Sequence, residues 1–299
     1  MVTPLTSLTT AQRRAYQQLC DASGRMLVVA MDQRGSMRTL IESPDRPVND
    51  SDLVASKLDL VRYLGNRAPG VLLDPEFAVP QVVDEGILAR DCALMVGMDQ
   101  TGYATGDHGL RVSRVVDGIN ARRVRELGGT AGKMNLYLRP DVEGVDSATA
   151  RLMRSVIEDF EREDALVVIE ILTYALPDED RDEFEAKSGD LVLGAAVLAR
   201  ECGAKVLKLQ YPGSAEGCRA VTEALGDIPW AVLSAGVDHT TFLGRLEIAL
   251  ANGAQGAIAG RSLWKDCLST DRAEQRRRLE ELAYPRLQEL QAQFAAAVV

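Results

Sequence analysis

Residues 204–211 read AKVLKLQY, a short apolar run that carries a lysine, Lys208, in its middle. Apart from Lys205, Lys208 and Gln210, the run is hydrophobic, and it does not alternate strictly between apolar and polar residues. A strand of this kind is typical of a parallel sheet that is covered on both faces. Because desolvating an ammonium group costs far more free energy than burying an aliphatic chain provides, Lys208 needs a functional explanation.

Seven further runs of the same kind are spread along the chain, and each is followed by a polar loop and a helical pattern. They are RMLVVAMD (25–32), PGVLLDPE (69–76), ALMVGMD (93–99), AGKMNLYL (131–138), ALVVIEIL (165–172), PWAVLSAG (229–236) and GAIAG (256–260). Eight strands that alternate with helices predict an α/β fold, a closed (β/α)8 TIM barrel. The alternative is a doubly wound open sheet, but no GxGxxG follows the first strand, where the chain reads MDQRGSM.

Additional helices are predicted at both ends of the chain. A helix over about residues 10–22 precedes the first strand and would close the bottom of the barrel. Residues 271–297 predict a C-terminal helix, or a helix pair that is interrupted near Pro285. Since no linker, low-complexity tract or second repeating pattern is present, we expect residues 1–299 to form a single barrel domain.

The composition narrows the class of protein. Of the 299 residues, 46% are hydrophobic and 26% are charged, as in ordinary soluble globular proteins, and the net charge of −10 argues against nucleic-acid and anionic-membrane partners. No segment has the ~18 apolar residues that a membrane span needs. The N-terminus lacks the pattern of a secretory signal, and the five cysteines are scattered without a CxxC pair, which favours reduced thiols and a cytoplasmic protein.

Ionisable residues stand at the carboxyl ends of several predicted strands, where barrels of this type build their active sites. Two of these residues have a simpler explanation. Asp32 could cap the following helix, and Lys133 could lie at the barrel bottom with its amine in solvent. Glu170 and Lys208 are harder to explain this way, because each interrupts a buried strand. Together, the four side chains would face one another as two acids and two amines, a set whose charges balance.

The strand order predicts a chemistry for this set. The strands of Lys133 and Lys208 flank the strand of Glu170, so the two amines are expected to lie close together. A neighbouring ammonium group and a dry environment both lower the pKa of an amine. A neutral amine can attack a carbonyl carbon and form a Schiff base, and Glu170 would then transfer protons.

A phosphate site and the absence of a metal site are also predicted. LSAG (233–236) and IAGR (258–261) end the last two strands, where barrels often bind phosphate through backbone N–H groups, and Arg261 adds a permanent charge. The only two histidines, His108 and His239, lack the spacing of zinc ligands, so we expect neither a metal nor a cofactor. Magnesium held by Asp74 and Glu76 remains an alternative.

Several blocks resemble one enzyme family. The blocks VVAMDQRGSMRTLI, VLLDPEF, MDQTGY, VVIEILTYA, VLKLQYP, VLSAGV and GAIAGRSLW, within residues 25–267, are similar to the Schiff-base barrels of the tagatose-1,6-bisphosphate aldolase family. The resemblance implies reversible cleavage of a ketose phosphate to dihydroxyacetone phosphate and an aldehyde. By motif, Lys208 is the Schiff-base lysine. The other implied site residues are Lys133, Glu170 and Asp32 for catalysis, with Gln33, Arg34, Ser234, Gly236, Gly260 and Arg261 for substrate binding.

Some questions stay open from the sequence. The family reads Lys-Val-Glu where this chain has Lys208-Leu209-Gln210, so a carboxylate beside the amine is missing. Arg139 is either a partner for the far anionic group of the substrate or a solvated loop residue. The related sulfofructose-phosphate aldolases and the transaldolases share the imine chemistry, and a non-catalytic phosphosugar-sensing barrel is a rival of another class. A small-molecule sugar phosphate is the expected partner, and we expect a homo-oligomer.

Overall fold

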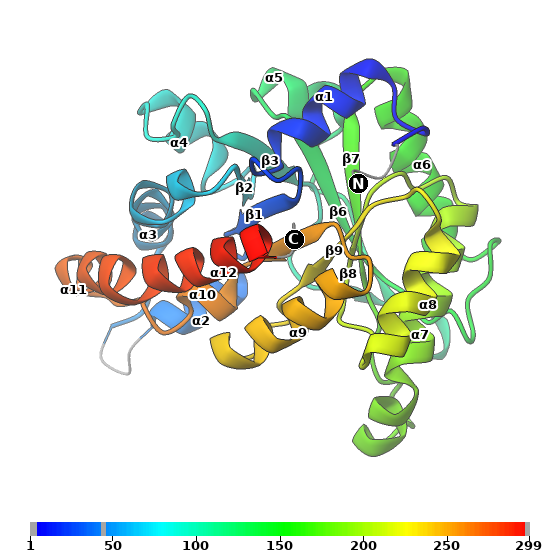
Figure 1. Ribbon diagram of the computed structural model, residues 1–299. Coiled ribbons are helices and arrows are strands. Elements are labelled where there is room, and N and C mark those ends of the chain that lie inside the picture. The colour runs from blue at the N-terminus through cyan, green and yellow to red at the C-terminus, as the bar shows by residue number, and fades with distance from the viewer. Residues whose placement is uncertain (1–4, 43–45, 297–299) are drawn as a thin grey trace.

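The computed structural model describes residues 5–42 and 46–296, and eight parallel strands close into a barrel (Figure 1). The strands are paired in the order β1-β10-β9-β8-β7-β6-β3-β2. Their bounds are β1 Met26–Ala30, β2 Gly70–Leu73, β3 Ala93–Gly97, β6 Ala131–Tyr137, β7 Leu166–Leu172, β8 Leu207–Leu209, β9 Trp230–Leu233 and β10 Gly256–Ala259. Each lies within one of the eight apolar runs, so the predicted TIM barrel is confirmed.

Helices follow every barrel strand and cover the outside of the barrel (Figure 1). They are α2 Gly35–Ile41, α3 Asp50–Tyr63, α4 Val79–Asp84, α5 Ala121–Glu126, α6 Ala148–Arg162, α7 Arg181–Glu201, α8 Ala215–Leu225, α9 His239–Ala251 and α10 Arg261–Trp264. A small antiparallel hairpin, β4 Ala104–Thr105 and β5 Arg111–Val112, lies in the segment between β3 and α5. No helix among the described residues is both long enough and apolar enough to cross a membrane.

Two apolar cores explain why the strands read as continuous hydrophobic runs. Along β7, Val167 and Ile169 face the surrounding helices, whereas Leu166 and Val168 face the barrel interior. Successive side chains of a strand point to opposite faces, and both faces are buried here. The next inward position after Val168 belongs to Glu170. The apolar interior therefore changes to charged side chains toward the carboxyl ends of the strands.

The N-terminal helix α1, Thr10–Gln18, closes the bottom of the barrel, as predicted. Tyr16 and Leu19 are buried in the interior core, and Leu19 Cδ2 lies only 3.0 Å from where a β-carbon on Gly70 would stand. The helix ends four residues before the predicted bound. It ends there because Cys20 pairs with Met26 in an antiparallel bridge that leads the chain into β1.

The C-terminal extension is a helix pair whose interruption lies immediately before Pro285. Helix α11, Arg272–Arg278, passes through a π-helical turn, Leu279–Ala283, into α12, Tyr284–Ala296. A proline inside a regular α-helix lacks an N–H group and crowds the carbonyl four residues earlier, and a wider turn relieves that conflict. The pair packs on α3, α9 and α10, so the predicted extension is confirmed.

Replacement of a plug residue tests the sealing role of α1. We expect Leu19→Ala to lower the free energy of unfolding by about 2–5 kcal/mol, because it leaves a cavity in a fully buried site. Urea denaturation followed by circular dichroism measures the change. Leu282→Ala is the matched control, since Leu282 is 42% exposed. Equal losses for the two variants would contradict a specific sealing role for α1.

Candidate active site

Four strands and the residues that follow them bring the four predicted catalytic side chains together at the barrel mouth. Asp32 follows β1, while Lys133 lies on β6, Glu170 on β7 and Lys208 on β8. Each stands two residues after an apolar residue of the interior core, so all four point inward. Glu170 and Lys208 are also direct neighbours in the register of β7 and β8.

Lys133 is the centre of this cluster. Its Nζ lies 2.7 Å from Asp32 Oδ2 and 2.7 Å from Asp99 Oδ1. The same amine lies 3.1 Å from Glu170 Oε2. The Lys133 side chain is only 2% exposed, so the simpler explanation, an amine that reaches solvent at the barrel bottom, is wrong.

Glu170 lies between the two amines. Its Oε1 is 2.8 Å from Lys208 Nζ, while its other carboxylate oxygen contacts Lys133. Lys208 is buried, with 4% of its surface exposed. A carboxylate within hydrogen-bond distance of a buried amine can take a proton from that amine before it acts as a nucleophile.

Asp99 is the member of the cluster that the sequence prediction missed. It follows β3, and its Oδ1 also accepts a hydrogen bond of 3.2 Å from the backbone N–H of Asn135. A signal was present, because Met98-Asp99-Gln100 after the third strand repeats Met31-Asp32-Gln33 after the first. Two identical tripeptides at equivalent strand ends place two carboxylates at the same level of the barrel.

The electrostatics divide the carboxylates into two kinds. Burial alone would raise the pKa of Asp32 and of Glu170, but the ammonium groups of Lys133 and Lys208 outweigh it and lower both pKa values. Burial, together with the nearby charges of Asp32 and Glu170, raises the pKa of Asp99. Three carboxylates and two ammonium groups balance when one carboxyl group is protonated, and Asp99 is the group that most readily holds that proton.

The charge of Lys133 is closely compensated. Burial acts to lower the pKa of Lys133, but Asp32, Asp99 and Glu170 together raise it well above its ordinary value. Lys133 therefore stays an ammonium group. The repulsion that it was expected to exert on Lys208 is offset by three carboxylates, so Lys133 does not act on Lys208 as an isolated positive charge.

A cavity of about 250 Å³ opens above Lys208 and Glu170. Five of the predicted substrate-binding residues line it: Gln33, Ser234, Gly236, Gly260 and Arg261. Gln33 donates to Asp32 Oδ1 over 3.1 Å. Its Oε1 is buried and has no hydrogen-bond partner within the described part of the chain, which suits a hydroxyl group of a ligand.

The loops after β9 and β10 form one wall of this cavity. Gly236 has a φ of +75°, and a β-carbon there would lie 3.2 Å from Arg261 Cζ. The guanidinium group therefore rests against a residue that has to be glycine. Lys265 fixes the loop from behind, since its Nζ donates to the carbonyl of Gly236 over 2.7 Å. Gly236, which is half-buried, therefore presents its backbone at the cavity wall.

Arg34 is the exception among the predicted binding residues. It is 8% exposed, forms an ion pair with Glu76 and donates a hydrogen bond to the backbone carbonyl of Asp99. It is not among the residues that line the cavity. Arg34 therefore joins three strand ends and holds the backbone at Asp99, and its predicted role in substrate binding stays a prediction.

Both readings of Arg139 are wrong. The side chain is fully buried, so it is not a solvated loop residue. Its guanidinium nitrogens contact Asp141 at 2.8 Å and Glu179 at 2.6 Å, and one of them donates to the carbonyl of Tyr174 over 2.8 Å. The charge of Arg139 is therefore paired, and its contacts connect the β6–α6 loop to the β7–α7 loop. Arg139 does not line the cavity.

Gln210 has a structural explanation. Its Oε1 accepts hydrogen bonds from the Thr173 backbone N–H over 2.7 Å and from Thr173 Oγ1 over 2.8 Å. Its Nε2 approaches the Thr173 carbonyl at 3.4 Å. An amide offers both a donor and an acceptor to the main chain, which a carboxylate cannot do. Gln210 therefore continues the β7–β8 pairing above the point where β8 ends.

The proposed magnesium ligands are otherwise engaged. Asp74 Oδ2 lies 2.5 Å from Nζ of the buried Lys57, and Glu76 pairs with Arg34. Lys57 also donates to the carbonyl of Met31 over 2.6 Å, which ties α3 to the end of β1. Within residues 5–42 and 46–296, no group of three or more His, Cys, Asp and Glu side chains is arranged to hold a metal ion.

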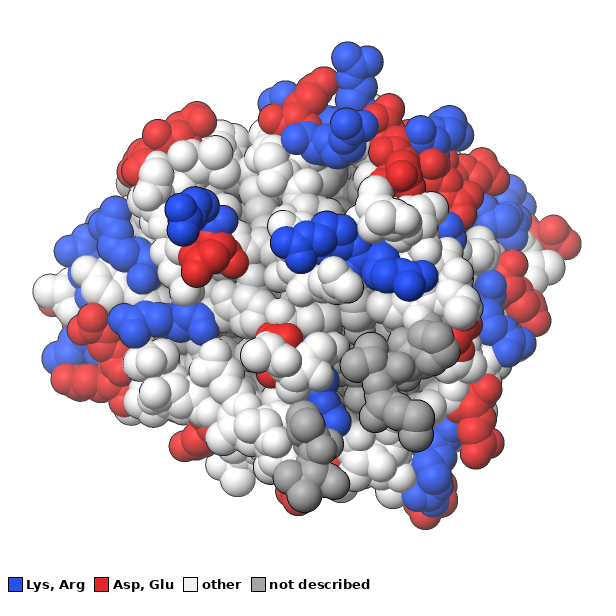
Figure 2. All heavy atoms as spheres, turned by 45° about the horizontal axis from the view of Figure 1, so that its top comes forward, with Lys and Arg blue, Asp and Glu red and all other residues white. Residues whose placement is uncertain are grey.

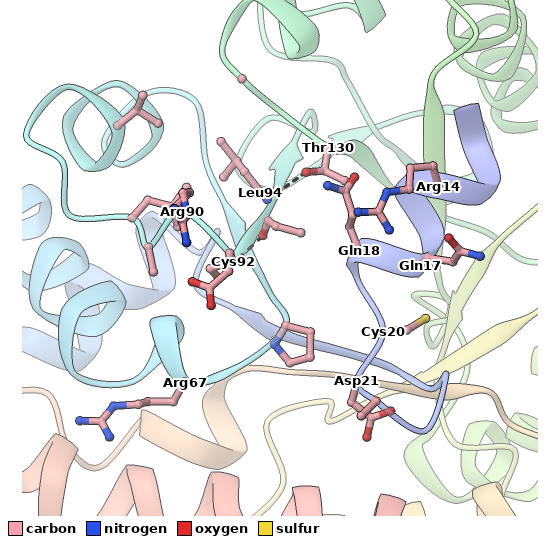
Figure 3. A pocket seen from close by; sticks show the side chains of 18 of the residues that line it. Arg14, Gln17, Gln18, Cys20, Asp21, Arg67, Arg90, Cys92, Leu94 and Thr130 are labelled. Carbon is pink, nitrogen blue, oxygen red and sulfur yellow. Dashed lines mark hydrogen bonds between the residues drawn. The ribbon is translucent and has the colours of Figure 1, made fainter. Parts of the chain in front are cut away.

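A larger cavity, of about 910 Å³, lies at the opposite end of the barrel (Figure 3). It is bounded by α1 and by the first residues of the strands, and Arg14, Arg67 and Arg90 are among its lining residues. Acidic and basic side chains are interspersed over the face that Figure 2 shows. None of the buried ionisable cluster lies in this larger cavity, so the smaller one at the carboxyl ends of the strands is the candidate active site.

Comparison with known proteins identifies relatives. The model of the DeoC/LacD family of aldolases matches residues 26–266. A tagatose 1,6-diphosphate aldolase of Staphylococcus epidermidis is 26% identical over 276 residues, which are 84% of each chain. Tagatose 1,6-diphosphate aldolase 2 of Streptococcus pyogenes serotype M1 is 27% identical over 286 residues, which are 86% of this chain and 85% of that protein.

Solved structures share the fold. A fructose-bisphosphate aldolase from Slackia heliotrinireducens is 17% identical, with a TM-score of 0.67 over 99% of this chain and 94% of that one. An archaeal fructose-1,6-bisphosphate aldolase, whose catalytic lysine is bound to a carbinolamine intermediate, is 17% identical, with a TM-score of 0.62 over 93% of this chain and 98% of that one. At this identity, the likeness supports the barrel fold alone.

Removal of the central ammonium group tests the electrostatic account. We expect Lys133→Met to lower the free energy of unfolding by about 3–5 kcal/mol near pH 7, because it leaves buried carboxylates without their partner. Lys205→Met is the control, with an expected change of about 0–1 kcal/mol, since the Lys205–Glu161 pair is partly exposed. Urea denaturation measures both changes.

The pH dependence of this difference in unfolding free energy provides a second test. Asp32 and Glu170 have lowered pKa values in the folded protein, so their ionised forms stabilise it above the ordinary pKa of about 4 and stop doing so as the pH falls. The difference between wild type and Lys133→Met is therefore expected to shrink below about pH 4. A difference that stays constant down to pH 3 would contradict this account.

Proposed function

Because this chain belongs to the DeoC/LacD family of aldolases, we propose that it is a class I enzyme that cleaves a ketose phosphate through a lysine Schiff base. The products are dihydroxyacetone phosphate and an aldehyde, and a ketose 1,6-bisphosphate such as tagatose 1,6-bisphosphate is the proposed substrate. The observation that carries the proposal is the buried Lys208 amine, 2.8 Å from Glu170 Oε1, at the floor of the cavity.

Lys208 is the nucleophile in this mechanism. Glu170 accepts a proton from the Lys208 ammonium, and the free amine adds to the C2 carbonyl of the ketose. The resulting carbinolamine loses water to give a protonated imine. Glu170 returns the proton that it took from Lys208 to the departing hydroxyl group, so Glu170 is a carboxylate again before the next step. Lys133 remains charged and holds the Glu170 carboxylate in place beside the amine.

The imine then serves as an electron sink. A carboxylate removes the proton of the C4 hydroxyl group, the C3–C4 bond breaks, and its electron pair moves into the imine to form an enamine. Glu170 is the carboxylate nearest to Lys208 and is proposed for this step, while Asp32 and Gln33 bind hydroxyl groups. After the aldehyde leaves, protonation at C3 and addition of water release dihydroxyacetone phosphate and restore Lys208.

The C1 phosphate is assigned to the loops after β9 and β10. Ser234 and Gly236 offer a hydroxyl group and a backbone N–H group along the cavity wall, and Arg261 supplies a permanent positive charge. Gly260 lines the same wall, with its N–H directed to Ser234 Oγ. The two loops of this wall follow strands that lie one and two places from β8, which carries Lys208, around the barrel. A phosphate held there would leave C2 of the substrate above the amine.

Reductive trapping tests the nucleophile. With dihydroxyacetone phosphate and borohydride, we expect an adduct on Lys208, which would block tryptic cleavage there and yield the peptide of residues 206–219. Peptide mass mapping detects that peptide. Lys208→Ala should lose the adduct and roughly 10³-fold or more of kcat, since covalent catalysis is removed. Lys205→Ala, three residues earlier and partly exposed, should keep both.

Two outcomes would overturn the proposed reaction. One is full activity in Lys208→Ala without any adduct. The other is binding of ketose phosphates by a wild-type protein that turns over none of them, which would favour a non-catalytic phosphosugar sensor. Light scattering on the same preparations tests the predicted homo-oligomer.

Removal of metal ions tests the metal-independent mechanism. We expect kcat to be unchanged after incubation with EDTA and gel filtration, because Lys208 takes the role that a divalent ion has in metal-dependent aldolases. A zinc-dependent aldolase treated in parallel serves as the control for chelation. Activity that is lost with EDTA and regained with a divalent ion would show that a metal takes part.

A further inference from the structure

Arg111 lies on the wall of the cavity opposite the proposed phosphate loops. It belongs to β5 of the small hairpin, and it lines the same cavity as Lys208 and Arg261. In the closed barrel, the hairpin segment connects β3 with β6, which are opposite β9 and β10 in the strand order. Arg111 and Arg261 therefore face the cavity from its two ends, with the reacting amine between them.

Three aromatic rings hold the Arg111 guanidinium group. Its Cζ lies 4.5 Å from the ring centre of Tyr103, 4.5 Å from that of Tyr174 and 5.6 Å from that of Tyr137. Tyr137 contacts Tyr103 and Tyr174 edge to face, so the three rings form one continuous cage. Stacking on aromatic faces holds a guanidinium group while its N–H edge stays available to an acceptor.

The backbone of Arg111 is fixed as well. Its N–H donates to the hydroxyl oxygen of Tyr174 over 2.8 Å. The neighbouring turn packs on the β7–α7 loop, since a β-carbon on Gly109 would stand 2.6 Å from Pro177 Cγ. Arg111 is therefore positioned before any ligand arrives, which reduces the entropy lost on binding.

The charge of Arg111 has no carboxylate to neutralise it. Arg111 forms no ion pair with any Asp or Glu among the described residues, in contrast to Arg34 and Arg139. The cavity lining holds Arg111, Lys208 and Arg261 but only one acid, Glu170, which is engaged by both lysines. Gln210, which lines the same cavity, adds no charge. A chain of net charge −10 thus concentrates positive charge at the two ends of one small cavity.

From this arrangement, we infer that Arg111 binds a tetrahedral oxyanion, either a phosphate or a sulfonate. This group is attached to the last carbon of the ketose, which leaves as part of the aldehyde. The inference rests on the proposed aldolase function and assigns a residue to the second anionic group of its substrate. The substrate carries an anionic group at both ends, one at Arg261 and one at Arg111. Sugars with a single phosphate would leave the Arg111 cage empty.

Condensation with matched acceptors tests the inference. Dihydroxyacetone phosphate is supplied with one of three acceptors. They are glyceraldehyde 3-phosphate, the three-carbon aldehyde that carries a sulfonate in place of the phosphate, and glyceraldehyde. We expect Arg111→Gln to lower kcat/KM for the preferred charged acceptor by roughly 10- to 100-fold, as for loss of a charged hydrogen-bonding partner. For glyceraldehyde, kcat/KM should change by less than about 2-fold. Whichever of the two charged acceptors the wild type uses with the higher kcat/KM shows whether the far group is a phosphate or a sulfonate.

Arg114→Gln is the matched control, because Arg114 is an exposed arginine three residues away in the same segment and its loss changes the net charge equally. It should retain the preference for charged acceptors. Trapping of Lys208 by dihydroxyacetone phosphate should proceed normally in Arg111→Gln. That result would show that the variant folds and that its imine chemistry is intact.

Failure of the inference and failure of the proposed function give different results. If Arg111→Gln slows charged and uncharged acceptors equally, or slows neither, Arg111 does not recognise the far group. If the wild type prefers the uncharged acceptor, the inference is also wrong, although the aldolase function stands. If the wild type neither condenses any acceptor nor yields a borohydride adduct, both are overturned.

Discussion

The contact of one buried ammonium group with three carboxylates is the interaction on which the site depends. Lys133 lies within 3.1 Å of Asp32, Asp99 and Glu170, and these side chains come from four different positions around the barrel. Without that ammonium group, three acids would share a dry space at the mouth and repel one another. The pair of Glu170 and Lys208 can exist as a reactive unit because Lys133 neutralises the acids around it.

Much of the fold was predictable because its determinants are local and repeated. Each strand is a short apolar run, and the two-residue period of a strand alone decides that Glu170 and Lys208 share the inner face. The four predicted catalytic residues meet for the same reason. Asp99 was missed although it repeats the Asp32 motif, because a single aspartate at a strand end also reads as a helix cap. The π-helical turn at Pro285 was anticipated only as an interruption.

Arginines were the least predictable residues. Arg34, Arg111 and Arg139 all lie beyond the barrel strands that precede them, and their sequence surroundings do not show which one is paired. Arg139 contacts Glu179 forty residues later, and Arg111 contacts rings from three separate segments of the chain. Contacts of this kind depend on how the loops fold over one another, so they leave no short-range pattern. The same holds for Gln210, whose partner Thr173 belongs to the neighbouring strand's loop.

The plug formed by α1 has a consequence for the order of events. With Tyr16 and Leu19 packed against the interior core, the barrel has one entrance, and every molecule that enters the cavity has to leave through the same mouth. In the proposed reaction, one product stays covalently attached to Lys208 while the other is free. Covalent attachment makes the aldehyde leave first, and the sealed floor makes it leave past the mouth loops. An aldehyde that enters for condensation has to approach the enamine by the same path, so the mouth loops act on both directions of the reaction.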